Sequence, residues 1–112
     1  MADDVTRIGA LAVREMLERG EHVVFVDTRT REAWDASDVK LPGAIRVPPD
    51  DVAAHRDEIR HDYAVITYCT SLHEEASAAV ARQLTDWGWS RAEPLAGGMD
   101  EWVREGLPTV PK

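Results

Sequence analysis

Cys69 is the only cysteine in the chain, and its surroundings favour chemistry more than those of any other residue. It follows the apolar run 64–68, which has the composition of a buried strand, and a polar segment separates it from an alanine-rich helix expected over 75–87. A thiolate is a strong nucleophile, and the amides and dipole of a helix N-terminus stabilise an anion beside them. Two interpretations of Cys69 follow: a nucleophile in a cradle of amides, or an inert buried cysteine at a strand end.

The polar segment after Cys69 is the candidate binding loop. Its residues are Thr70, Ser71, Leu72, His73, Glu74 and Glu75. A loop that curls back to a helix points several backbone amides at one spot, which suits a thiolate or a bound anion. Ser71 and Glu74 also have the spacing of a capping box, which would only start the helix. His73 is either a proton donor or acceptor for the thiol or a solvated loop residue.

The residue composition argues against metal and redox-pair chemistry. One cysteine forms no internal disulfide, no CxxC pair and no cysteine zinc cluster. The 4 histidines are scattered without the spacing of metal ligands. We therefore expect no metal site and no cofactor.

Length and charge narrow the class of protein further. The 112 residues suit one domain, 1–112, with a core that needs no metal or disulfide. A net charge of −8 disfavours binding to nucleic acid or to an anionic membrane. No apolar run approaches the roughly 18 residues of a membrane helix, and the acidic N-terminus is unlike a secretory signal. We expect a cytoplasmic protein without nucleic-acid or membrane partners.

Strand-like and helix-like segments alternate along the chain. Strands are expected at 23–26, 45–47, 64–68 and 94–95, and helices at 5–19 (with Thr6 as its cap), 31–36, 52–59, 75–87 and 100–104. This alternation predicts an α/β fold with a mainly parallel sheet covered by helices on both faces. Ligands of such sheets bind outside the carboxyl ends of the strands, where Cys69 is expected.

Two stretches of the sequence resemble the rhodanese-like domain family. The first stretch reads VDTRTREAWDASDVKLPGAIRVP. The second reads LAGGMDEWVREGLP and is the more specific match to the family. Together with the predicted strand that ends in ITYC, the resemblance covers about residues 6–110. It implies a single rhodanese-like domain of about five strands with the cysteine at the base of a cradle loop. It also implies that Asp27 and Arg29 support the wall of the site, and that Gly97, Gly98 and Trp102 are structural.

The resemblance further implies a sulfurtransferase of the thiosulfate:cyanide type. Cys69 would take the outer sulfur of a small donor such as thiosulfate, hold it as a persulfide on the amides of 70–75, and pass it to a thiophilic acceptor such as cyanide or a protein thiol. The resemblance leaves the physiological donor, the acceptor and the oligomeric state open.

The cradle segment departs from the family pattern at two positions. Leu72 stands where active loops carry glycine, and Glu74 stands where they carry a cation. A carboxylate at ~5 Å from a bound anion costs about 1–3 kcal/mol per unit charge, so we expect thiosulfate to be a poor donor. The alternative function is a weak or inactive rhodanese-like binding or regulatory module. A phosphatase of the same architecture needs arginine six residues after the cysteine, where this chain has Glu75.

Overall fold

A parallel four-stranded sheet forms the centre of the computed structural model, which describes residues 6–70 and 75–112. The strands, in spatial order β3-β1-β4-β5, are β3 (Ile45–Arg46), β1 (Val23–Asp27), β4 (Ala64–Tyr68) and β5 (Ala92–Pro94). Beyond β5, Ile8 forms a parallel bridge with Leu95. The predicted α/β fold with a mainly parallel sheet is confirmed; the sheet has four strands where about five were expected, and Ile8 adds only an isolated bridge at its edge.

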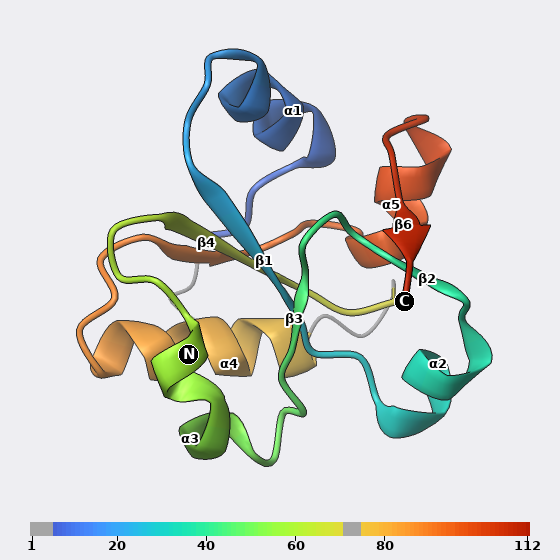
Figure 1. Cartoon of the computed structure of the whole chain (residues 1–112). Coiled ribbons are helices and arrows are strands. Elements are labelled where there is room, and N and C mark those ends of the chain that lie inside the picture. The colour runs from blue at the N-terminus through green and yellow to red at the C-terminus, as the bar shows by residue number, and fades with distance from the viewer. Residues whose placement is uncertain (1–5, 71–74) are drawn as a thin grey trace.

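Helices cover both faces of the sheet (Figure 1). Helices α1 (Ala10–Glu18) and α5 (Gly98–Arg104) pack on one face, and α3 (Val52–His55) and α4 (Glu75–Asp86) pack on the other. Successive residues of β1 and β4 point to opposite faces: Phe25 and Ile66 join one apolar cluster, and Val26 and Val65 join the other. The uninterrupted apolar runs in the sequence reflect this two-sided burial.

The first helix begins later than predicted. Instead of spanning 5–19, it starts at Ala10, and its N-cap is Gly9 in an extended conformation (φ −81°, ψ 157°) rather than Thr6. The parallel bridge of Ile8 with Leu95 keeps the preceding backbone extended, which is incompatible with a helix there. Sheet pairing therefore overrides the helical periodicity of these residues.

Other element ends shift by smaller amounts. The predicted helix 52–59 is α3 followed by a 3-10 turn, Arg56–Glu58, while α2 (Arg31–Ala36) has its predicted bounds. The antiparallel pair β2 (Val39–Lys40) and β6 (Val110–Pro111) was not predicted, because two-residue strands show no alternation. None of the helices within 6–70 and 75–112 is long and apolar enough to cross a bilayer.

The start of α5 packs directly against the chain as it leaves β4. The amides of Met99 and Asp100 donate to the carbonyls of Cys69 (2.8 Å) and Thr70 (3.0 Å). Gly98 has φ +59°, and a Cβ there would lie 2.4 Å from the Cys69 oxygen and 2.7 Å from the Thr70 oxygen. Only glycine permits both this backbone conformation and this approach. The glycine-rich motif of the sequence thus fixes the backbone at Cys69.

We predict that Gly98→Ala destabilises the protein by more than Gly43→Ala. Gly43 also has a left-handed conformation (φ +70°), but open space surrounds its missing Cβ, so its substitution isolates the conformational cost of about 1–2 kcal/mol. Gly98→Ala adds a clash with the backbone at Cys69. Urea unfolding of both variants measures the difference, and equal losses of unfolding free energy would contradict the close packing of Gly98 against the backbone at Cys69.

Candidate functional site

Cys69 lies at the carboxyl end of β4, as the sequence predicts. It directly follows the fully buried strand Ala64–Tyr68, and only 4% of its own surface is exposed. Its carbonyl accepts from α5, so the backbone is held from one face of the sheet. The side chain extends towards the other face, where α4 begins.

The sulfur of Cys69 meets Ser77 in the first turn of α4. The Sγ atom lies 3.7 Å from the Ser77 hydroxyl, and Ser77 is fully buried. The Thr67 hydroxyl donates to the Ser77 carbonyl at 2.8 Å, which ties the first turn of α4 to β4. A hydroxyl at this place can donate to a thiolate or a persulfide. The sequence reasoning missed Ser77; the available signal was a small polar residue on the apolar face of an alanine-rich helix.

The predicted binding loop is described only at its two ends. Thr70 is exposed directly after Cys69, and Glu75 is the exposed first residue of α4. Ser71, Leu72, His73 and Glu74 lie outside the described residues. Their predicted part in binding remains a prediction, while the contact between Cys69 and Ser77 places the beginning of α4 beside the sulfur.

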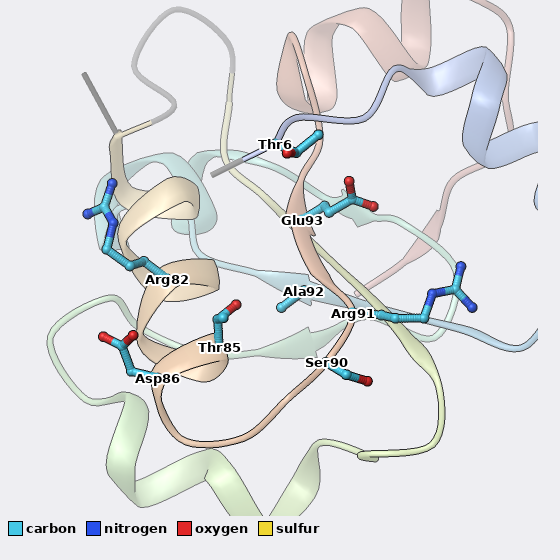
Figure 2. Close-up of a pocket in the computed structure, with 8 residues that line it drawn as sticks. All are labelled: Thr6, Arg82, Thr85, Asp86, Ser90, Arg91, Ala92 and Glu93. Atoms are coloured by element: carbon cyan, nitrogen blue, oxygen red, sulfur yellow. The ribbon is translucent and has the colours of Figure 1, made fainter. Parts of the chain in front are cut away.

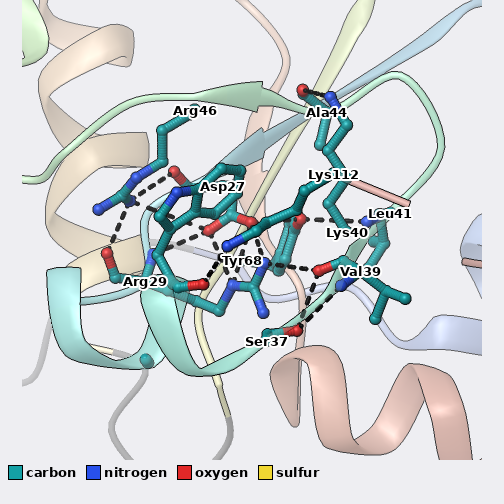
Figure 3. A network of polar contacts seen from close by, with 12 residues as sticks. Asp27, Arg29, Ser37, Val39, Lys40, Leu41, Ala44, Arg46, Tyr68 and Lys112 are labelled. Atoms are coloured by element: carbon teal, nitrogen blue, oxygen red, sulfur yellow. Dashed lines mark hydrogen bonds and ion pairs between the residues drawn. The ribbon is translucent and has the colours of Figure 1, made fainter. Parts of the chain in front are cut away.

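Asp27 and Arg29, the two predicted supporting residues, form a buried ion pair (Figure 3). The Arg29 amide donates to Asp27 Oδ1 at 3.0 Å, Nε contacts both carboxylate oxygens at 3.1 and 3.0 Å, and Nη2 donates to Oδ2 at 2.7 Å. Nη2 also donates to the Val39 carbonyl at 3.0 Å. A buried charge is tolerated when its partners satisfy it to this extent.

Tyr68 connects this ion pair to the strand that carries Cys69. Its hydroxyl donates to Asp27 Oδ2 at 2.6 Å and accepts from the Leu41 amide at 3.2 Å. The Thr28 amide and hydroxyl both donate to the Tyr68 carbonyl, at 2.8 and 2.9 Å. Burial and the charge of Asp27 raise the pKa of the Tyr68 phenol well above its ordinary value, so the hydroxyl stays a donor. The network locks the ends of β1 and β4 together beside Cys69.

A separate polar concavity of about 570 Å³ lies between the end of α4 and β5 (Figure 2). It is lined by Thr6, Arg82, Thr85, Asp86, Ser90, Arg91, Ala92 and Glu93. Ala92 pairs with Val65 near the amino end of β4, whereas Cys69 follows the carboxyl end. This hollow therefore belongs to the opposite end of the sheet. Within 6–70 and 75–112, no group of three or more histidine, cysteine or acidic side chains is placed to hold a metal ion.

Comparison with known proteins establishes the family. Residues 10–105 match the rhodanese-like domain, so the chain belongs to the rhodanese-like domain family. It is 30% identical over 106 residues to a sulfurtransferase of Allochromatium vinosum, with 95% of each chain covered. It is also 30% identical over 108 residues to the thiosulfate sulfurtransferase GlpE of Glaesserella parasuis, covering 96% of this chain and 95% of that one.

The fold agrees with this assignment. The rhodanese-like domain of an Anabaena protein superposes with a TM-score of 0.77 at 22% sequence identity, over 95% of this chain and 79% of that one. The two relatives named as sulfurtransferases support a sulfurtransferase family for this chain. The family predicted from the two sequence motifs is thereby confirmed.

We predict that Tyr68→Phe lowers the free energy of unfolding by about 1–3 kcal/mol, because it leaves the buried Leu41 amide without its acceptor and removes a donor from Asp27. Tyr63→Phe is the matched control: Tyr63 is half-buried and stacks on His22, and its substitution should change stability by less than about 0.5 kcal/mol. Equal losses in the two variants, measured by chemical denaturation, would contradict the network.

Proposed function

We propose that this protein is a sulfurtransferase that carries sulfane sulfur as a persulfide on Cys69 and passes it to a thiophilic acceptor. The observation that carries the proposal is the position of the Cys69 sulfur, at the carboxyl end of β4 and 3.7 Å from the hydroxyl of Ser77 in the first turn of α4. The sulfurtransferase names of the two relatives support the same activity.

In the loading step, the Cys69 thiolate attacks the outer sulfur of a sulfane donor. A new S–S bond forms at Cys69, the donor's S–S bond breaks, and the donor remnant leaves with the electron pair; from thiosulfate, that remnant is sulfite. In the unloading step, the acceptor's nucleophile attacks the outer sulfur of the persulfide, and Cys69 leaves as a thiolate. Neither step needs an external oxidant, a reductant or a metal.

The surroundings of Cys69 suit an anion in both steps. The first-turn amides of α4 and the hydroxyl of Ser77 stabilise a thiolate and a terminal persulfide sulfur. The outer sulfur of a persulfide extends about 2 Å beyond Sγ, towards the cradle that we assign to residues 70–75. Asp27 and Arg29 bind no sulfur in this proposal; they hold the strand ends in register.

We expect one sulfur atom to be transferred per protein molecule in a single-turnover experiment. The protein is incubated with a sulfane donor, freed of donor by gel filtration, and then mixed with cyanide. Thiocyanate should form in an amount close to that of the protein, and Cys69→Ser should form none. Failure of the wild-type protein with every donor tried would favour the non-catalytic binding module instead.

We propose further that the family departures at Leu72 and Glu74 make thiosulfate a poor donor. Glu74→Arg should raise kcat/KM for thiosulfate by about tenfold or more, because it replaces a repulsive charge with an attractive one. Glu15→Arg is the matched control, since Glu15 is an exposed residue of α1 and the change in net charge is the same. Equal effects of the two substitutions would contradict a specific role of Glu74.

A further inference from the structure

A second concavity, of about 620 Å³, lies beyond the end of β3. It is lined by Thr30, Arg31, Arg46, Pro48, Pro49 and Asp50. Thr30 and Arg31 follow the carboxyl end of β1, Arg46 is the last residue of β3, and the other three residues follow Arg46. The hollow therefore opens at the edge of the sheet where Cys69 lies. The activity proposed above assigns it no role.

Arg46 is the partly buried cation of this concavity. Its side chain is 21% exposed, and Nη1 donates to the carbonyls of Arg29 (2.6 Å) and Asp27 (3.2 Å). The guanidinium carbon lies 5.2 Å from the centre of the Trp34 ring. In Figure 3 its other terminal nitrogen points away from the network. Backbone carbonyls and an aromatic face thus hold the guanidinium in place while one of its ends faces outwards.

The charge around Arg46 is only partly neutralised. The buried Asp27 carboxylate lies 4.0 Å from Arg46 Nη1, but its closest cationic partner is Arg29, at 2.7 Å. Two guanidinium groups therefore share the buried carboxylate of Asp27, and the exposed carboxylate of Asp35 adds a weaker attraction to Arg46. Burial lowers the pKa of Arg46, the charge of Asp27 opposes that shift, and the charge of Arg29 adds to it. A ligand carboxylate would restore the balance through a charge-assisted contact.

Two other charged residues line the hollow. Arg31 is exposed, and its Nε lies 3.7 Å from the exposed carboxylate of Asp35, so solvent weakens the pair and Arg31 brings only part of its charge to the rim. Asp50, also exposed, opposes an anion. The lining thus holds two arginines and one aspartate, with Asp35 beside Arg31, in a chain whose net charge is −8. Cationic character of this kind on an acidic protein favours an anionic group of a ligand.

The sheet register relates the concavity to Cys69. Asp27 pairs with Arg46 on β3 and with Tyr68 on β4, so the three residues form one row across three strands. Cys69 follows Tyr68 directly. The backbones of β3 and β4 are two interstrand spacings apart, or about 10 Å, but the Arg46 guanidinium reaches back to the Asp27 carbonyl on β1, so one to two spacings, about 5–10 Å, separate it from β4. An inorganic sulfur donor is too small to bridge that length, whereas a thiol compound of a few residues can bridge it.

We propose that this concavity binds the carboxylate of a thiol acceptor whose sulfur reaches Cys69. The inference rests on the proposed sulfurtransferase function and names its acceptor class: a thiol with a carboxylate about 5–10 Å away. The acceptor thiolate attacks the outer sulfur of the Cys69 persulfide, the S–S bond to Cys69 breaks, and Cys69 leaves as a thiolate. The products are the acceptor persulfide and the unloaded protein.

The test compares two peptides that differ by one charge. Acetyl-Cys-Gly-Gly with a free C-terminal carboxylate spans the required length, and its C-terminal amide is the uncharged control. Mixed with persulfide-loaded wild-type protein at low ionic strength, the acid should react at least about fivefold faster than the amide. A ratio near one in the wild-type protein would overturn the inference.

Variants locate the effect. Arg46→Gln should bring the acid-to-amide ratio close to one, Arg31→Gln should lower it, and Asp50→Asn should raise it. Arg31 and Asp50 are exposed, so their variants report on charge even if Arg46→Gln folds poorly. Arg82→Gln, in the hollow at the opposite end of the sheet, should leave the ratio unchanged. An unchanged ratio in both Arg31→Gln and Asp50→Asn would overturn the inference.

A binding measurement separates this inference from the proposed function. S-methylated forms of both peptides cannot accept sulfur, and their binding is followed through the Nε–Hε resonance of Arg46 by NMR. A shift with the acid but not with the amide supports the carboxylate site even if no sulfur is transferred. Transfer to cyanide without any Arg46 shift would retain the sulfurtransferase and overturn the acceptor site.

Discussion

The carboxylate of Asp27 is the group on which the organisation of the site depends. It lies fully buried at the end of β1 and receives hydrogen bonds from Arg29 and from the Tyr68 hydroxyl. Through Arg29 it reaches the Val39 carbonyl, and through Tyr68 it reaches the Leu41 amide. One charge thereby joins β1, β4 and the segment that leads into β3. Because an unpartnered buried charge is costly, the contacts of these elements with Asp27 support one another.

Cys69 stands next to this network and is held from both faces of the sheet. On one face, the first amides of α5 bind the carbonyls of Cys69 and Thr70, and Gly98 permits the close approach. On the other face, the sulfur meets Ser77 at the beginning of α4. Fixed backbone and a helix N-terminus suit a residue that alternates between thiolate and persulfide, because little reorganisation is then needed at each step. On β3, Arg46 continues the row formed by Asp27 and Tyr68 and lines the concavity that we propose binds the carboxylate of the acceptor.

Much of the fold was predictable because its signals are local. The apolar runs of β1 and β4, with buried residues facing both sides, indicated a parallel sheet with Cys69 at its carboxyl edge. The predicted start of α1 was wrong because Ile8 pairs with Leu95, a residue far away in the sequence. Asp27 and Arg29 were predicted as supporting residues of the site only because of the family resemblance. The contacts of Tyr68 with Asp27 and of Ser77 with Cys69 depend on how separate elements pack against one another. No local sequence pattern predicts such packing, so these contacts were missed.

The central claim is that Cys69 carries sulfane sulfur, and the most direct measurement is the mass of the peptide that contains Cys69. The protein is loaded with a sulfane donor, treated with an alkylating agent that preserves persulfides, digested and analysed by mass spectrometry. The account predicts that this peptide gains the mass of one sulfur atom beyond the alkyl group, and that cyanide added before alkylation removes the gain. A peptide carrying only the alkyl group, after exposure to every donor, would contradict the account.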